Sequence, residues 1–248
     1  MRKGSTGKRR RRVLYAVLAA ALLFALTAGI YLGRYSRSAP TAARYLESGG
    51  TVTVERVPGG RRFDGPGEGS ALIFYPGGKV EAEAYAPLLF RLAEGGEDCF
   101  LAEMPFRLAI TDVDAAADFI AAYDYDEWIL AGHSLGGAAA AMYASREAGG
   151  IDGLVLLAAY PTKPLPDGVR LLSVYGSEDA VLNRDKYESG RAFWPEDAEE
   201  IVIEGGNHAQ FGDYGPQRGD GEATITAEEQ VKQTADAILK VVNGDGSH

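Results

Sequence analysis

A serine framed by glycines stands at positions 132–136, where the chain reads Gly-His-Ser-Leu-Gly. An apolar run precedes it and a run of small residues follows it. This G-x-S-x-G pattern between an expected strand and an expected helix predicts a nucleophile elbow, a strained turn that exposes the Ser134 hydroxyl above a sheet. Side chains in place of Gly132 and Gly136 would collide with the neighbouring strand and helix. Such a serine attacks acyl carbons, and it requires a base.

Three histidines are candidates for that base: His133, His208 and His248. His248 ends the chain in a Gly-Asp-Gly-Ser-His tail, and the turn of the elbow is expected to point His133 elsewhere. His208 remains, on a loop that follows an apolar run, and is the expected base. Gln210 and Asp213 come soon after it, and we expect them to shape its loop rather than to contact its ring.

A carboxylate that orients the histidine is expected between the serine and the histidine in the chain. Asp179 follows an expected strand that ends at Gly176. A carboxylate there can hold the imidazole and stabilise its charged form. Glu178 and Asp185 are the nearby alternatives, and Asp179 is favoured over both.

The composition sets limits on what the chain can be. Its 248 residues, 46% of them hydrophobic, allow one good-sized domain with a real core. Cys99 is the single cysteine, so an intramolecular disulfide is excluded, and we expect it and Trp194 to pack in the core. Cysteine and histidine are too scarce for an obvious zinc site, and no G-x-x-x-x-G-K-[ST] loop is present. No cofactor or metal is therefore expected.

The net charge of −10 hides an asymmetry between the two parts of the chain. Residues 1–37 carry nine Lys and Arg and no acid, whereas the remainder has 16 basic residues against 35 acidic ones. So acidic a domain repels nucleic acid and anionic membrane surfaces, which argues against a polyanion-binding role. The sequence leaves the oligomeric state open.

Residues 13–33 form a run of 21 residues without a charge. As a helix this run spans the ~30 Å hydrocarbon core of a bilayer. Seven basic residues precede it, which predicts a cytoplasmic N-terminus and an extracytoplasmic domain. The alternative is a cleaved signal peptide, whose apolar core is usually only ~7–15 residues long. The chain is thus expected to comprise a basic N-terminus, 1–12, a transmembrane helix, 13–33, a linker, 34–50, and a folded domain, 51–248.

Short apolar strands alternate with helices after the linker. Strands are expected at 51–57, 71–75, 99–104, 128–131, 154–158, 169–174 and 201–203, a turn at 59–69, and helices at 81–94, 112–123, 137–147 and 227–242. This alternation predicts an α/β fold with a mostly parallel sheet of about seven strands and helices on both faces. Active groups in such folds lie at the carboxyl ends of strands, where Ser134, Asp179 and His208 are all expected.

Four motifs, each at the end of an apolar run, follow one another in the order found in one superfamily. They are Phe-Tyr-Pro-Gly-Gly-Lys at 74–79, the elbow at 132–137, Tyr-Gly-Ser-Glu-Asp at 175–179 and Gly-Gly-Asn-His-Ala at 205–209. From about Thr51 to Val242 the chain resembles the α/β-hydrolases, and it is similar to their compact, lid-poor branch of dienelactone hydrolase-like proteins. Two departures stand out: the first motif has Tyr-Pro where His-Gly is common, and the nucleophile is serine where dienelactone hydrolases use cysteine. Their specific substrate is therefore not implied.

An oxyanion hole in this fold takes one backbone N–H from the residue after the nucleophile, here Leu135. The second comes from the loop after the strand at 71–75, and by position it is Gly78, with Lys79 as the alternative. Only eight residues, 161–168, lie where many lipases insert a helical lid, and three of them are proline. This favours an open site and small or exposed substrates.

The sequence therefore predicts a membrane-anchored serine hydrolase that cleaves small ester, lactone or related acyl substrates through an acyl-enzyme. Ser134, Asp179 and His208 would form its catalytic triad. The alternative is a catalytically silent domain of the same fold that serves as an extracytoplasmic binding module. The residues do not name a natural substrate.

Overall fold

The computed structural model describes residues 5–146 and 150–242. The chain forms two compact units, Met1–Tyr35 and Ser36–His248. His248, the tail histidine, lies outside the described residues.

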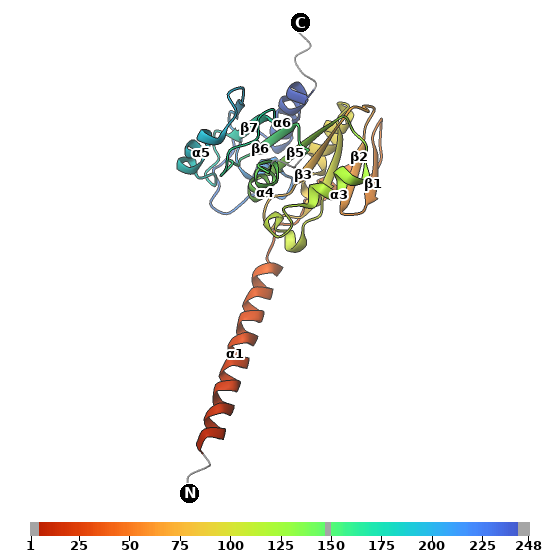
Figure 1. Cartoon of the computed structure of the whole chain (residues 1–248). Coiled ribbons are helices and arrows are strands. Elements are labelled where there is room, and N and C mark those ends of the chain that lie inside the picture. Colours follow the sequence, from red (N-terminus) through yellow and green to blue (C-terminus); the bar gives the residue numbers. More distant parts are fainter. Residues whose placement is uncertain (1–4, 147–149, 243–248) are drawn as a thin grey trace. The chain divides into compact units, whose positions relative to one another are not determined.

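The first unit contains one helix, α1, Ser5–Gly33 (Figure 1). Its part from Arg10 to Gly33 is long and apolar enough to cross a membrane. A helix that is apolar all round lacks the polar face that a surface helix of a globular protein needs. By length and composition α1 is a candidate membrane span or signal sequence.

An eight-stranded sheet with the order β1-β2-β4-β3-β5-β6-β7-β8 forms the centre of the second unit (Figure 1). The strands are β1 (Thr53–Val57), β2 (Gly60–Asp64), β3 (Ser70–Tyr75), β4 (Asp98–Ala102), β5 (Glu127–His133), β6 (Gly153–Leu157), β7 (Arg170–Gly176) and β8 (Glu199–Ile203). From β4 to β8 all neighbours run parallel, and β1 and β2 are antiparallel at one edge. The predicted mostly parallel sheet is confirmed, with eight strands where about seven were expected.

β2 is the strand that the sequence pattern missed, because the segment 59–69 is rich in Gly, Pro and Arg and resembles a turn. Pro58 and Gly59 alone make the turn, with Gly59 at φ 82°. Arg62 can lie in the sheet because its guanidinium hydrogen bonds to Asp98 at 2.9 Å and to Tyr125 at 2.9 Å.

Helices cover both faces of the sheet (Figure 1). One face carries α2 (Ala86–Glu94) and α6 (Ala227–Val242), and the other carries α3 (Ala115–Ala122) and α4 (Leu135–Ala144). Alternate residues of β3 serve the two cores: Leu72 and Phe74 pack on the first side, Ile73 and Tyr75 on the second. Burying each of these large apolar side chains contributes about 1.5–3 kcal/mol.

Shorter elements complete the described chain. They are α5 (Arg184–Gly190) and the 3₁₀ helices η1 (Pro40–Leu46), η2 (Ala82–Tyr85), η3 (Pro105–Arg107), η4 (Ala109–Thr111), η5 (Arg191–Phe193) and η6 (Ala209–Phe211). The expected helix at 81–94 is divided into η2 and α2, because Pro87 has no N–H to donate and suits the first turn of a new helix.

Two segments outside the sheet bear on the site. Residues 36–50, expected as a linker, belong to the second unit: Ala42 is fully buried, and the Tyr45 ring lies 5.5 Å from that of Phe90. Residues 158–169, between β6 and β7, form no helix in the described chain, so they leave the carboxyl edge of the sheet without a helical cover there.

Candidate active site

Ser134 occupies the sharp turn between β5 and α4, with φ 53° and ψ −119°. The left-handed φ is unfavourable for a residue with a side chain and marks a strained position. A Cβ atom on Gly132 would lie 2.6 Å from the carbonyl carbon of Gly136, and one on Gly136 would lie 2.1 Å from the Tyr75 carbonyl oxygen. The expected collisions are confirmed, so the turn requires both glycines.

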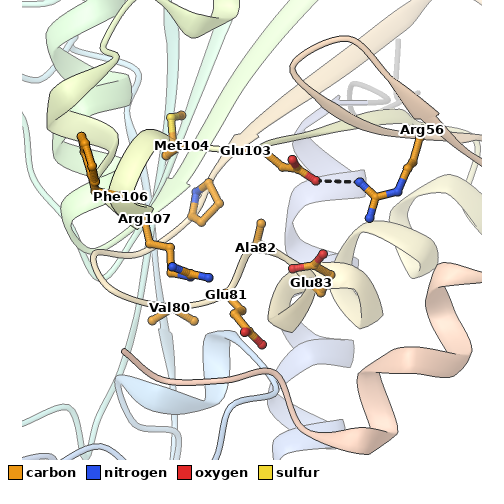
Figure 2. A pocket seen from close by; sticks show the side chains of 10 residues that line it. Arg56, Val80, Glu81, Ala82, Glu83, Glu103, Met104, Phe106 and Arg107 are labelled. Carbon is orange, nitrogen blue, oxygen red and sulfur yellow. Dashed lines mark hydrogen bonds and ion pairs between the residues drawn. The ribbon is translucent and has the colours of Figure 1, made fainter. Parts of the chain in front are cut away.

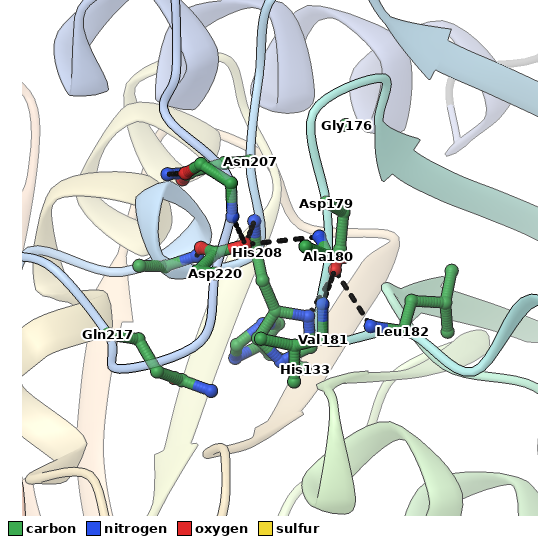
Figure 3. Close-up of polar contacts among 12 residues, drawn as sticks. His133, Gly176, Asp179, Ala180, Val181, Leu182, Asn207, His208, Gln217 and Asp220 are labelled. Atoms are coloured by element: carbon green, nitrogen blue, oxygen red, sulfur yellow. Dashed lines mark hydrogen bonds and ion pairs between the residues drawn. The ribbon is translucent and has the colours of Figure 1, made fainter.

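Asp179 and His208, from the loops after β7 and β8, are joined by a hydrogen bond of 2.8 Å between Oδ2 and Nδ1 (Figure 3). Both residues are buried, with 6% and 2% of their surfaces exposed. The other carboxylate oxygen of Asp179 accepts hydrogen bonds of 2.8 Å from the N–H groups of Val181 and Leu182. The carboxylate is thereby held in one orientation towards the imidazole.

The charge state of Asp179 follows from these contacts. Burial alone would raise its pKa, but the hydrogen bond and charge of His208, together with the backbone N–H groups, outweigh burial and hold the pKa below its usual value. An ionised carboxylate only accepts hydrogen bonds, so Nδ1 of His208 carries the proton. Nε2 then has the free lone pair that a general base needs.

The other polar side chains near Asp179 and His208 in the sequence have different surroundings. Glu178 and Asp185 are both exposed. Gln210 hydrogen bonds through its side-chain nitrogen to the Ile225 carbonyl, and Asp213 binds Thr41. Within the described residues, none of these side chains hydrogen bonds to the His208 ring.

His133 does not point away from the site as expected. Its ring centroid lies 4.5 Å from that of His208 and 5.5 Å from that of Phe211, and only 1% of the residue is exposed. The Tyr85 hydroxyl lies 2.8 Å from its Nδ1. Burial and the charge of nearby His208 lower the pKa of His133 well below its usual value. His133 is therefore a neutral packing partner of His208.

This ring contact brings His208 next to the elbow, because Ser134 directly follows His133. Ser134 is half-buried, and in the described part of the chain its hydroxyl has no hydrogen-bond partner. The bond between such a hydroxyl and its base is often long in free enzymes and tightens when substrate binds.

One N–H group is unused in the loop after β3. Pro76 has no N–H, and the Gly78 N–H has no acceptor within the described residues. The remaining N–H groups of the loop donate as follows: Gly77 to the Tyr85 hydroxyl at 3.1 Å, Lys79 to the Arg107 carbonyl at 2.7 Å and Val80 to the Gly77 carbonyl at 3.3 Å. Because the Lys79 N–H already has an acceptor, Gly78 is favoured over Lys79 as an oxyanion donor.

Gly78 also lies against the start of α4. A Cβ atom placed on it would lie 2.7 Å from Cδ2 of Leu135. Leu135 is the first residue of α4, and the first N–H groups of a helix have no partner within the helix. Gly78 and Leu135, which carry the two expected donors, thus pack against each other.

Strained backbone gathers at this edge of the sheet. The described non-glycine residues with φ between 50° and 61° are Lys79, Phe106, Arg107, Ser134 and Ala158. They follow β3, β4, β5 and β6, in each case at the carboxyl end. Such strain persists where the surrounding structure enforces it, and it concentrates at functional sites.

Asp220 supports the site through hydrogen bonds to two of its loops, and the sequence did not indicate this role. One of its oxygens accepts hydrogen bonds of 3.3 Å from the N–H groups of both Ala180 and His208, and the other accepts one of 2.8 Å from Ala209 (Figure 3). It therefore ties the loop of Asp179 to the loop of His208. Nothing in its flanking glycines separates it from the other 34 acidic residues.

Gln230 of α6 supports the same loop from behind. Its side chain accepts a hydrogen bond of 2.9 Å from the Asn207 N–H and donates one of 2.8 Å to the Asn207 carbonyl. Gln230 is fully buried, as is Thr234 one turn later. The sequence signal that could have revealed this support is the presence of two polar residues, Gln230 and Thr234, on the inward face of an amphipathic helix.

A cavity of about 410 Å³ lies beside the loop that carries Gly78 (Figure 2). Pro76, Val80 and Met104 are among its walls, and Arg107 extends its side chain into it. Neither Ser134 nor His208 lines it. Within the described residues, no three His, Cys, Asp or Glu side chains are grouped to hold a metal ion.

Residues 71–232 match the sequence model of the Alpha/beta hydrolase family. Among solved structures, Est1E from Butyrivibrio proteoclasticus is 15% identical with a TM-score of 0.53, over 79% of this chain and 100% of that chain. The thermophilic esterase Est2 from Thermogutta terrifontis is 16% identical with a TM-score of 0.53, over 79% and 94%. MGS-MChE2, an alpha/beta hydrolase enzyme from a sediment metagenome of the Mar Chica lagoon, Morocco, is 15% identical with a TM-score of 0.57, over 77% and 100%. No curated protein matches the sequence.

Proposed function

Because the chain belongs to the alpha/beta hydrolase family, we propose that it is a serine hydrolase acting on small ester, lactone or related acyl substrates. The observation that carries the proposal is the buried Asp179–His208 hydrogen bond beside the strained turn of Ser134. The structural neighbours named as esterases agree with hydrolytic chemistry. The family match does not single out the dienelactone hydrolase-like branch.

In the proposed reaction, Ser134 Oγ attacks the substrate carbonyl carbon while Nε2 of His208 takes the hydroxyl proton. The carbonyl oxygen becomes an oxyanion that accepts hydrogen bonds from the N–H groups of Leu135 and Gly78. The tetrahedral intermediate collapses, the bond to the leaving oxygen breaks, and His208 returns the proton to it. Water, deprotonated by His208, then cleaves the acyl-enzyme and regenerates Ser134.

The surroundings of the site favour small substrates. The segment 158–169 forms no helix over the carboxyl edge of the sheet. The cavity beside the Gly78 loop is large enough for a small ester, since binding pockets typically measure about 300–1,000 Å³. We place the part of the substrate beyond its reacting carbonyl in this cavity.

We further propose that residues 13–33 anchor the protein in a membrane with residues 1–12 in the cytoplasm and the hydrolase unit outside. The seven basic residues before Val13 support this orientation. A cleaved signal peptide would instead yield a mature chain that begins near Ala39.

The test uses the full-length protein in detergent, a fluorophosphonate probe and a series of esters of graded acyl length. Labelling of the wild type but not of Ser134→Ala, with turnover reduced on the order of 10⁶-fold in the variant, is the expected result. A folded wild type that neither labels nor hydrolyses any ester would instead support the silent binding module. An unchanged rate in Ser134→Ala would refute the mechanism.

A further inference from the structure

The first six residues of the second unit, Ser36–Thr41, form a segment that we call the strap. It contacts two loops that the site depends on. At its start, the Ser36 N–H donates to the Lys79 carbonyl at 2.8 Å, and the Glu81 N–H donates to the Ser36 carbonyl at 2.9 Å. Ser36 thereby forms a parallel bridge with Val80. The strap is thus bonded to the loop that carries Gly78.

A charged side chain reinforces this contact. The N–H and the hydroxyl of Ser38 both donate to one carboxylate oxygen of Glu81, at 2.9 and 3.2 Å. Hydrogen bonds to an ionised acceptor are roughly twice as strong as neutral ones. Ser38 and Glu81 are both half-buried, so water competes only partly for this carboxylate.

The other end of the strap is bonded to the loop after β8. The Ala39 N–H donates to the Asp213 carbonyl at 2.7 Å, and the Thr41 hydroxyl donates to the Asp213 carboxylate. Asp213 stands five residues after His208, and η6 lies between them. The strap therefore joins the loop of the proposed base to the loop of a proposed oxyanion donor.

We propose that the strap is a positioning element of the active site, which fixes the loop of Gly78 relative to the loop of His208. The sheet links these loops only indirectly, because β5, β6 and β7 separate β3 from β8. Beside the strap, the Asp213 N–H donates to the Ala84 carbonyl of η2 at 2.7 Å, so the strap adds its bonds to this contact. Misplacing a catalytic group by 1 Å can cost about 10²-fold in rate. The strap acts through Gly78 and His208 and does not touch the reacting atoms. This inference rests on the proposed function, since its effect is on turnover.

The test compares variants of the full-length protein. Ser38→Ala with Thr41→Val removes both strap hydroxyls and should lower kcat about tenfold, with KM within about twofold of the wild type, because base and oxyanion donor act in the transition state. Ser38→Thr with Thr41→Ser keeps both hydroxyls and should restore kcat.

A matched pair controls for general effects on the same part of the chain. The Val54 N–H donates to the Ser48 hydroxyl at 2.9 Å, and within the described residues neither Ser48 nor Thr51 hydrogen bonds to the Gly78 loop or to the His208 loop. Ser48→Ala with Thr51→Val should therefore leave kcat unchanged. Equal kcat in wild type and in the Ser38/Thr41 double variant would overturn the proposal, as would an equal loss in the control pair.

Amide hydrogen exchange gives a readout that does not depend on turnover. The N–H groups of Lys79, Val80 and Gly212 should exchange faster in the Ser38/Thr41 double variant than in the wild type. Unchanged exchange at these amides overturns the strap proposal even if the enzyme is active. If these amides exchange faster but the protein shows neither ester turnover nor Ser134 labelling, the strap still holds the two loops in place. The proposed function is then refuted, and with it the effect of the strap on catalysis.

Discussion

Asp179 and Asp185 are identical residues six positions apart, and their surroundings give them different roles. Asp179 is buried against His208, whereas Asp185 is exposed in the first turn of α5. Asp179→Asn should lower turnover by up to ~10⁴-fold, because an amide neither fixes the imidazole tautomer nor stabilises its charged form. Asp185→Asn is the matched control and should change kcat little. A crippling effect of Asp185→Asn alone would mean that the acid is misassigned.

Tyr85 carries a second prediction at this scale. It is fully buried, and burial raises its pKa well above the usual value, so its hydroxyl stays protonated. That hydroxyl accepts from the Gly77 N–H and lies in hydrogen-bond contact with His133. Tyr85→Phe should reduce the free energy of unfolding by about 1–3 kcal/mol, because buried polar groups lose their partner.

Urea unfolding of Tyr85→Phe checks this value. Tyr143→Phe is the control, because the described structure gives the hydroxyl of Tyr143 no hydrogen bond. It should change the free energy of unfolding by less than about 0.5 kcal/mol. Equal losses in the two variants would show that the contact of Tyr85 with Gly77 and His133 adds nothing specific.

At the scale of elements, the proposed membrane anchor α1 carries the prediction about the protein's location. Full-length protein should stay with membranes after salt and alkaline washing, because 21 uncharged residues insert by hydrophobic transfer. Deleting residues 1–35 should release a soluble, active unit that still holds the strap. In sealed right-side-out vesicles the hydrolase unit should be open to added protease. Full protection, or a mature chain starting near Ala39, would contradict this topology.

The strands could largely be predicted from the sequence because buried parallel strands are continuous apolar runs. β3, with Ala-Leu-Ile-Phe-Tyr, packs on both faces and shows this plainly. β2 could not be predicted, since Arg61 and Arg62 make it polar in sequence. Its place in the sheet depends on Asp98 and Tyr125, which are distant in the chain.

In the site, too, features that the local sequence shows differ from features that depend on distant residues. Ser134 and His208 can be proposed from the sequence because their own chemistry and their place after a strand are visible there. His133 and Asp220 were not, because their roles come from which loops meet: His133 packs on His208, and Asp220 joins the Asp179 and His208 loops. Such roles depend on tertiary contacts that no local pattern encodes.

For the molecule as a whole, one buried acid makes stability depend on pH. Glu97 is 1% exposed, and one of its oxygens accepts a hydrogen bond of 2.5 Å from Ser70. Burial raises its pKa from 4.5 to about 7. The folded state therefore holds a proton that the unfolded chain releases at lower pH. The contribution of protonated Glu97 to the free energy of unfolding is complete below pH 4.5, and it is lost as the pH rises through about 7.

Glu97→Gln removes the titration and keeps an oxygen for Ser70. The variant should match the wild type near pH 4.5 and exceed its free energy of unfolding at pH 8 by up to about 3 kcal/mol. Glu94→Gln, at an exposed position nearby, should show no such pH-dependent difference. Parallel stability curves for Glu97→Gln and wild type between pH 4.5 and pH 8 would exclude this role of Glu97.

The sheet order leaves β1 and β8 as its two edges. Open edges expose unpaired backbone groups on which a strand of another copy can add, the first step of aggregation. Glu55 and Arg56 are exposed on β1, and β8 begins with exposed Glu199 and with Glu200, whose carboxylate is paired with Arg191. Two copies that paired through β8 would have to bring the exposed Glu199 carboxylates into their interface. We therefore expect exposed charges on both edge strands to disfavour edge-to-edge pairing of copies at high local concentration.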